Sequence, residues 1–163
     1  MNKVTLRPFT YDDIETYRGW VNDPQVGRLI GRDVPVTKEE HLHWYLRLMR
    51  DANAIVFAIE VKSQYIGNVW LYNIDRENKK AEVRILIGIE QGKGYGKKVI
   101  GVIADDAIKG LHLNRLYAYV FEYNKRAKKA FESAGFVVEG LLKSDRFLNG
   151  NYVDTYIMAK VKE

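Results

Sequence analysis

The sequence lacks cysteine and long apolar runs. None of its 163 residues is a cysteine, so disulfide bonds, thiolate metal sites and cysteine nucleophiles are excluded, and nothing indicates an oxidising compartment. No apolar run approaches the roughly 20 residues that a membrane-spanning helix needs, and residues 1–8 lack the apolar centre of a signal peptide. We therefore expect a cytoplasmic protein with no membrane partner.

Proline and linker-like segments are also scarce. Only three prolines occur, and no repeat, low-complexity tract or linker rich in Gly and Ser divides the chain. With 163 residues, of which 47% are hydrophobic, the chain can bury one substantial core but not two ordinary ones. We predict a single domain over residues 1–163.

The excess of positive charge is modest and clustered. Lys and Arg number 26 against 21 Asp and Glu, and the excess gathers at residues 93–98 and 125–129. Such clusters suit a polyanionic ligand, whereas most of the other cations form a solvated surface. The chain lacks the paired aromatic signature of RNA-recognition modules. We expect no nucleic-acid partner.

Hydrophobic period, capping residues and turn signals together predict the elements. Thr10 with Asp13 and Thr37 with Glu40 have capping-box spacing, while Asp23-Pro24 ends the first helix and opens a loop that runs to Thr37. Helices are expected from Thr10 to about Asn22, from Thr37 to Arg50, after Gly96 to Gly110, and from Asn124 to Ala134. Strands are expected at residues 4–8, 55–61, 65–72, 81–87, 116–121, 137–142 and 152–161.

The order of these elements indicates the fold class. Residues 55–87 form an antiparallel meander, and Asn149-Gly150 is a strong hairpin signal between the last two strands. The order is β-α-α-β-β-β-α-β-α-β-β. It predicts an α/β (α+β) fold with a mixed, mostly antiparallel sheet of six to seven strands and helices on both faces.

The glycine-rich segment 91–97, Gln-Gly-Lys-Gly-Tyr-Gly-Lys, joins a predicted strand to a predicted helix. A helix amino terminus presents unpaired N–H groups and partial positive charge, and glycines let an anion approach them. The P-loop and dinucleotide patterns both fail, because neither a hydroxyl residue nor the third spaced glycine follows. A phosphorylated cofactor other than ATP or NAD is indicated; the alternative is a tight turn without a ligand.

Three segments together resemble the GCN5-related N-acetyltransferase (GNAT) family. Residues 91–96 match its cofactor motif, which is Gln or Arg, two residues, Gly, one residue, then Gly or Ala. Residues 124–136 look like its second signature. Residues 149–158 look like the closing hairpin of the branch that includes ribosomal-protein N-terminal, spermidine and amino-sugar acetyltransferases. The resemblance covers nearly the whole chain and implies acetyl-CoA as co-substrate.

The resemblance also implies which residues hold acetyl-CoA. The backbone of Ile85, Leu86 and Ile87 would bind the pantetheine arm. The pyrophosphate would lie on Gln91, Gly92, Lys93, Gly94, Tyr95, Gly96 and Lys97. Asn124 would reach the pantetheine end, although it fits a helix cap equally well.

Glu82 lies where members of this branch carry a glutamate that deprotonates the acceptor amine. Arg84 shares its face by strand alternation, and an adjacent guanidinium would stabilise the carboxylate and weaken it as a base. The position of the family's usual acid, a tyrosine, is occupied by Phe131, which cannot donate a proton. Tyr123 or Ser133 are the candidates to replace it; alternatively, the thiolate leaves with help from water and backbone dipoles.

The function implied is transfer of acetyl from acetyl-CoA to a primary amine by direct attack in a ternary complex. We expect the acceptor to be an amino-sugar nucleotide or a protein N-terminus; spermidine is disfavoured, because a polycation prefers an acidic cleft. The alternative is a non-catalytic CoA-binding sensor, which Phe131 and Arg84 favour. His41 and His43 cannot share a helical face, so we expect no metal. A homodimer is expected because related folds often dimerise through their late strands.

Overall fold

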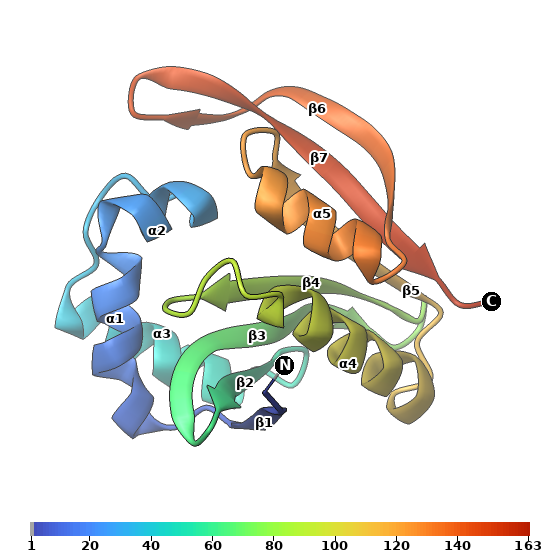
Figure 1. The fold of residues 1–163 in the computed structure, drawn as a ribbon, viewed down its shortest axis with the longest axis horizontal. Helices are drawn as coiled ribbons and strands as arrows, with labels where there is room; N and C mark the ends of the chain where they lie inside the picture. Colours follow the sequence, from blue (N-terminus) through green and yellow to red (C-terminus); the bar gives the residue numbers. More distant parts are fainter. Residues whose placement is uncertain (1) are drawn as a thin grey trace.

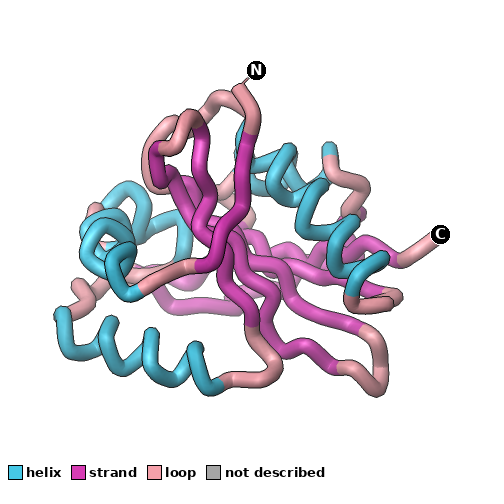
Figure 2. Tube along the Cα trace, turned by 90° about the horizontal axis from the view of Figure 1, so that it is seen from below, coloured by secondary structure: helices cyan, strands magenta, loops and turns pink. Residues whose placement is uncertain are grey.

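The computed structural model describes residues 2–163 and shows a mixed sheet with helices on both of its faces (Figures 1 and 2). The strands are β1 (Val4–Pro8), β2 (Ile55–Val61), β3 (Gln64–Asp75), β4 (Lys80–Ile87), β5 (Arg115–Phe121), β6 (Val137–Leu148) and β7 (Asn151–Val161). The helices are α1 (Ile14–Val21), α2 (Pro24–Ile30), α3 (Lys38–Arg50), α4 (Tyr95–Gly110) and α5 (Lys125–Ser133), and a 3-10 turn over Tyr11–Asp13 precedes α1.

The seven strands have the order β1-β2-β3-β4-β5-β7-β6. Every neighbouring pair is antiparallel except β4 and β5, which are parallel. The predicted mixed, mostly antiparallel sheet is therefore confirmed. The hairpin between β6 and β7 turns at Asn149 and Gly150, whose φ angles of 50° and 79° are those that a tight hairpin turn requires.

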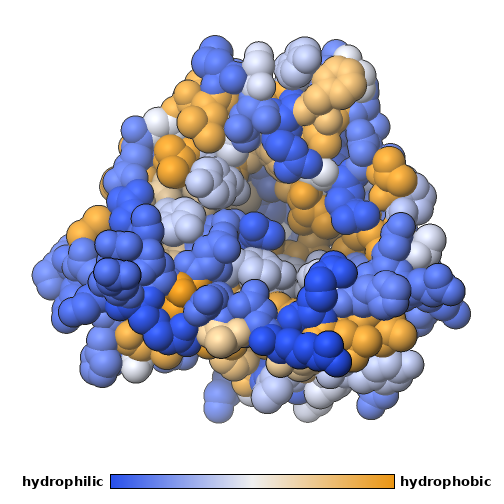
Figure 3. Space-filling model, turned by 180° about the vertical axis from the view of Figure 1, so that it is seen from behind, coloured by the Kyte–Doolittle hydropathy of each residue, from blue (hydrophilic) through white to orange (hydrophobic). Residues whose placement is uncertain are grey.

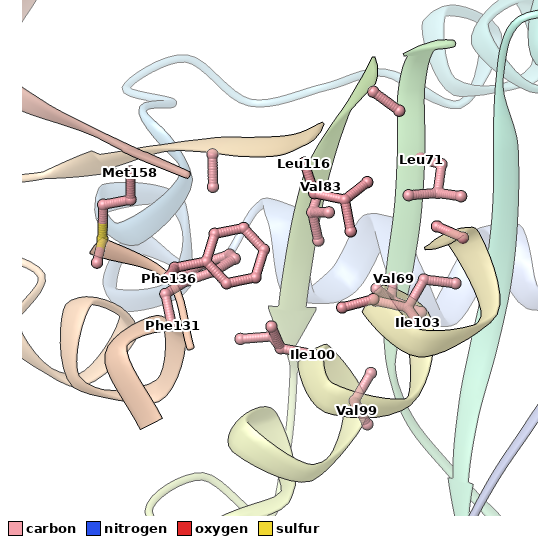
Figure 4. Close-up of a cluster of buried hydrophobic side chains, with 14 of the residues drawn as sticks. Val69, Leu71, Val83, Val99, Ile100, Ile103, Leu116, Phe131, Phe136 and Met158 are labelled. Atoms are coloured by element: carbon pink, nitrogen blue, oxygen red, sulfur yellow. The ribbon is translucent and has the colours of Figure 1, made fainter. Parts of the chain in front are cut away.

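Strand alternation divides the core between the two faces of the sheet. Val69 and Leu71 of β3 point to the face that α4 covers with Val99, Ile100 and Ile103 (Figure 4). Trp70, between them in sequence, belongs to a second cluster with residues of α1 and α3. α5 packs against α4 and adds Phe131 to the first cluster. Apolar helix faces on both sides thus fix the plane of the sheet.

Both predicted capping boxes are present. The Asp13 carboxylate accepts the Thr10 backbone N–H at 2.8 Å, and Thr37 and Glu40 exchange side-chain bonds with each other's backbone N–H at 3.1 and 3.0 Å. Asp13 also receives two guanidinium nitrogens of Arg7 at 2.7 and 2.8 Å. This buried carboxylate therefore ties β1 to the start of α1.

The prediction of a loop from Asp23-Pro24 to Thr37 is wrong in part, because residues 24–30 form α2. Asp23 caps this helix by accepting the N–H groups of Gln25 and Val26, and Pro24 occupies its first turn. Proline ends a preceding helix but is well suited to the first turn of the next one, where its missing N–H is not needed. Gly31, with a φ of 77°, ends α2.

Gly67 of β3 is required because the backbone of β4 lies very close to it. A Cβ at this position would lie 2.1 Å from the Leu86 carbonyl oxygen, which is far inside contact distance. We expect Gly67→Ala to lower the free energy of unfolding by about 1–3 kcal/mol, the cost of forcing a backbone shift in a packed core. Urea denaturation followed by circular dichroism measures this change.

The matched control is Gly101→Ala in α4, where an added Cβ meets nothing within 4 Å. Alanine is the better helix former, so this variant should gain about 0.5–1 kcal/mol. Equal stability of the Gly67→Ala variant and the wild type would contradict the close approach of β3 and β4.

Candidate functional site

Three cavities meet where β4 faces α2. The first has a volume of about 610 Å³ and lies along the glycine loop; the second, of about 520 Å³, contains Glu82; the third, of about 470 Å³, contains four aromatic rings. We call them the loop cavity, the central cavity and the aromatic cavity. Ile30 and Ile85 line all three, so the cavities adjoin one another around these two side chains. The space-filling view shows a hollow at the centre of one face of the molecule (Figure 3).

The cavities exist because β4 and β5 separate. Only residues Lys80–Glu82 of β4 pair with residues Arg115–Tyr117 of β5, although β4 continues to Ile87. Within residues 2–163, the stretch Ile85–Ile87 has no strand partner on the β5 side. Backbone N–H and C=O groups need partners when they are shielded from water, so this free edge of β4 is suited to bind an amide-containing ligand as an added strand would.

The glycine loop brings backbone N–H groups to the mouth of the loop cavity. Gly92 and Gly94 have φ angles of 78° and 82°, a conformation that glycine adopts without strain. Gly94 is also the N-cap of α4, so the helix begins at Tyr95, inside the glycine loop and two residues before the predicted start after Gly96. The loop cavity is therefore placed at the positive end of the helix dipole.

Ten of the eleven residues predicted to hold the cofactor line the loop cavity, namely Ile85, Leu86, Ile87, Gln91, Gly92, Gly94, Tyr95, Gly96, Lys97 and Asn124. Lys93 does not; its ammonium group is bonded to Glu90. Arg126 and Lys129 of α5 also line the cavity. They were not named individually, but the cationic cluster at residues 125–129 was the signal for them.

Asn124 has the capping role that was one of its two interpretations. Its Oδ1 accepts the Ala127 N–H at 3.1 Å. Its side chain lines both the loop cavity and the central cavity. The second interpretation, contact with the cofactor, stays a prediction.

Glu82 is buried beside Arg84 in the central cavity. Only 5% of Glu82 is exposed, and its Oε2 lies 2.5 Å from Arg84 Nε. Burial lowers the pKa of Arg84, but the bond to Glu82 outweighs it and the net pKa is raised. The predicted shared face of the two residues is confirmed. Arg84 also lies over the Tyr72 ring, 4.3 Å from its centroid, and so borders the aromatic cavity.

Neither residue considered as a replacement for the general acid, Tyr123 or Ser133, lines the central cavity. Phe131 is buried edge-to-face against Phe136, with 5.0 Å between ring centroids. The Tyr123 hydroxyl donates to the Arg28 carbonyl, and Ser133 lines the loop cavity instead of the central one. Thr155 lines the central cavity and is only 2% exposed. Its hydroxyl has no hydrogen-bond partner among the described residues. No sequence pattern pointed to this residue.

α2 forms the roof of the site. In Figure 1 it faces α5 and the β6–β7 hairpin. Arg146 donates to the Gly31 carbonyl at 2.9 Å, and the Asn149 N–H donates to Asp33 at 3.2 Å. These bonds join the end of α2 to the hairpin more than a hundred residues later in the chain, a contact that local sequence signals cannot reveal.

The aromatic cavity lies between α1 and α3 on one side and β3 and β4 on the other. Tyr17, Trp44, Trp70 and Tyr72 supply its rings, and Arg32, Glu40, His41, Arg47 and Arg84 supply its polar groups. His41 is stacked on Tyr17, with 4.9 Å between ring centroids. Its pKa is lowered to about 4, first because the ring is buried and then because Arg32 and Arg18 lie near it. At neutral pH the ring is uncharged.

The described residues form neither a membrane-spanning helix nor a metal-binding cluster of side chains. No helix in residues 2–163 is long and apolar enough to cross a membrane. No group of three or more His, Asp or Glu side chains in that range is arranged to hold a metal ion.

Comparisons with known proteins agree with this geometry. A family model described as an acetyltransferase (GNAT) domain matches residues 3–137. Spermidine N(1)-acetyltransferase of Vibrio cholerae is 36% identical over 155 residues, covering 94% of this chain and 90% of the relative. The crystal structure of spermidine N-acetyltransferase from Vibrio cholerae with CoA and spermine has a TM-score of 0.91 at 28% identity, covering 97% of this chain and 95% of that one. A dodecameric structure of spermidine N-acetyltransferase from the same organism has a TM-score of 0.82 at 28% identity, covering 97% and 93%.

The lowered pKa of His41 predicts a pH dependence of stability. Between the unfolded value of 6.5 and the folded value of about 4, the unfolded chain binds more protons than the folded one, so the free energy of unfolding falls as the pH falls through this window. His41→Gln should flatten this slope, as measured by urea denaturation at several pH values. His43→Gln, at an exposed position of the same helix, is the control and should keep the slope. An unchanged slope in His41→Gln would contradict the burial of an uncharged ring.

Proposed function

Because this chain belongs to the GNAT acetyltransferase family, as the sequence motifs predicted, we propose that it moves the acetyl group of acetyl-CoA to a primary amine by direct attack in a ternary complex. Family membership and the matching structure that contains CoA make the chain an acetyl-CoA-dependent N-acyltransferase. The roles of individual residues and the identity of the acceptor are the parts that we propose.

The observation that carries the proposal is the position of Glu82. It lies at the point where β4 and β5 separate, in the cavity that connects the loop cavity with the aromatic cavity. A carboxylate at this junction is within reach of an amine that enters from the aromatic side and a thioester that enters from the loop side. Proximity of two reactants and a base is the largest help that a protein gives to such a reaction.

The residues of the loop cavity fit acetyl-CoA. Left-handed glycines at the start of α4 present N–H groups to a pyrophosphate, and Lys97, Arg126 and Lys129 add positive charge around it. The free edge of Ile85–Ile87 offers backbone partners to the two amides of pantetheine. Bound acetyl-CoA supplies an activated acyl group with a thiolate leaving group.

Glu82 has a defined task in this scheme. An ammonium ion cannot attack a carbonyl, so Glu82 accepts one proton from the acceptor amine, directly or through a water molecule. The nitrogen lone pair then bonds to the thioester carbon, the carbon–sulfur bond breaks with its electron pair on sulfur, and the second proton that the nitrogen loses passes to that sulfur or to water. Arg84 holds the Glu82 carboxylate in one orientation at 2.5 Å.

The same ion pair is the observation that favours the alternative, a CoA-binding sensor without turnover. A carboxylate occupied by Arg84 and a phenyl ring at position 131 both reduce catalytic power. The two functions differ in one measurement. Both bind acetyl-CoA, but only the enzyme releases CoA in proportion to an added amine.

Self-association is a further part of the proposal. Val137, Phe147 and Tyr152 of the β6–β7 hairpin are 62%, 61% and 69% exposed, and β6 is an edge strand of the sheet. Exposed apolar groups on an edge strand favour pairing with another chain. A dodecameric relative agrees with a homo-oligomer, of which a dimer is the smallest form.

The base assignment predicts the effect of Glu82→Gln. This variant keeps the shape of the side chain but cannot accept the proton, so kcat should fall by about a hundredfold or more while acetyl-CoA binding, measured by calorimetry, is retained. Glu60→Gln is the matched control, because Glu60 is another strand glutamate paired with an arginine, Arg7, at 2.9 Å. Full turnover of Glu82→Gln across the pH range would show that Glu82 is not the base.

Two substitutions of Asn124 separate its two roles. Asn124→Asp keeps the oxygen that caps α5, whereas Asn124→Ala removes it and should cost about 1 kcal/mol of stability. Both remove the amide N–H donors, so both should weaken acetyl-CoA binding by about three- to tenfold if that amide contacts the cofactor. Calorimetry and thermal unfolding give the two readouts. Wild-type affinity in Asn124→Asp would leave the cap as the only role of Asn124.

A further inference from the structure

The aromatic cavity contains a buried donor that no described residue satisfies. Trp70 is 5% exposed and lines this cavity, and within residues 2–163 its indole Nε1 has no hydrogen-bond partner. Indole nitrogen can only donate, and a buried donor without an acceptor is unfavourable. Because Nε1 has less than 1 Å² of accessible surface, an acceptor atom of a ligand would satisfy this donor only after the Trp70 ring turns toward the cavity.

The charges of the cavity have the same preference. Arg32, Arg47 and Arg84 line it. Arg84 is paired with Glu82, whereas Arg32 and Arg47 have no carboxylate within 4.0 Å anywhere in the described part of the chain. Arg32 and Arg47 are exposed residues that border the cavity without a carboxylate partner.

The remaining polar groups do not reverse this balance. Glu40 is the one carboxylate that lines the cavity among the described residues, and its Oε2 already accepts the Thr37 N–H at 3.0 Å. Burial raises the pKa of the Tyr17 hydroxyl, so Tyr17 stays protonated. His41 is uncharged at neutral pH because its pKa is about 4. The cavity offers donors and positive charge, and it has little to hold a polycation.

We propose that the acceptor is a small amine that also carries an oxyanion, a phosphate or a carboxylate, which Arg32 and Arg47 bind in the aromatic cavity while the amine reaches Glu82. This inference rests on the proposed acetyl transfer. Arginine is suited to the oxyanion because its planar guanidinium binds phosphate and carboxylate oxygens in pairs.

The dimensions agree with a small molecule. A volume of about 470 Å³ lies within the range of ligand pockets, which is roughly 300–1,000 Å³. Arg84, Ile85 and Ile30 line both the aromatic and the central cavity, so one molecule can extend from Arg32 and Arg47 toward Glu82. The aromatic rings leave space for an apolar or planar portion between its two ends.

The test compares matched amines by the rate of CoA release. Glucosamine is compared with glucosamine 6-phosphate, butylamine with 4-aminobutyrate, and spermidine is the polycation. We expect the anionic member of at least one pair to have a kcat/KM about tenfold higher than its neutral partner, the size of one charge-assisted contact, and spermidine to be the poorest substrate. The first pair reports phosphate and the second carboxylate.

Variants assign this preference to the arginines. Arg32→Gln and Arg47→Gln should each lower kcat/KM for the preferred anionic amine by about tenfold, with a smaller loss for its neutral partner. Arg50→Gln is the control, because Arg50 is exposed in the last turn of the same helix as Arg47 but does not line the cavity. Circular dichroism verifies that all three variants are folded.

Calorimetric titration of the CoA-bound protein with glucosamine 6-phosphate and with 4-aminobutyrate gives a readout that does not depend on turnover. The site is supported if either compound binds, and if Arg47→Gln weakens this binding while Arg50→Gln leaves it intact. This holds even if no amine causes CoA release. A lack of CoA release would instead refute the proposed acetyl transfer. Efficient turnover of spermidine in preference to every anionic amine would overturn the inference and leave the acetyl transfer standing. So would equal anion preference in Arg32→Gln, Arg47→Gln and the wild type.

Discussion

β4 and β5 are hydrogen-bonded only where Lys80–Glu82 of β4 pairs with Arg115–Tyr117 of β5. Beyond this point β4 continues to Ile87 and β5 to Phe121. Parallel strands need a long crossover between them, and here the crossover is the glycine loop with α4. The strands therefore part on the side where the loop turns into the helix. This separation exposes the edge of β4, opens the three cavities and places the positive end of α4 at one of them. Without it the sheet would close and no ligand could enter its centre.

The gap would be unstable if nothing supported its sides. α5 packs against α4 and inserts Phe131 beside Phe136 in the core below the opening. α2 crosses above it and is held to the hairpin of β6 and β7 through the Gly31 carbonyl. A Cβ added at Gly31 would lie 2.7 Å from the Phe121 ring, so glycine leaves room for that ring. The roof and the floor are thus made by segments far apart in sequence. Ile30, the last residue of α2, lines the loop, central and aromatic cavities. A substrate that enters from the aromatic side therefore has to pass under α2.

The sequence predicted the parts of this arrangement that depend on local chemistry. The capping residues Thr10 and Thr37, the hairpin at Asn149-Gly150 and the glycine loop each have a short-range physical cause, and each was found where it was predicted. α2 was missed because Pro24 is both a stop for one helix and a good first residue for the next. Thr155 was missed as a cavity-lining residue for another reason, and the cationic cluster at residues 125–129 indicated an anionic ligand without showing which of its side chains would line the cavity. Which side chains meet across a gap depends on how elements pack, and no local pattern contains that information.

Membership in a family and choice of acceptor have different physical bases in this molecule. The reaction depends on backbone features, the free edge of β4 and the start of α4, and a backbone can stay the same while side chains change. The proposed acceptor site is lined by side chains of α1, α3 and the segment after α2, which do not line the loop cavity. Relatives that acetylate polyamines therefore show what the cofactor half does, but they do not constrain the charge of the other half. In the proposed acceptor site, the guanidinium groups of Arg32 and Arg47 border the cavity without a carboxylate partner and would repel a polycation bound there. The acceptor is thus better inferred from these two residues than from overall similarity.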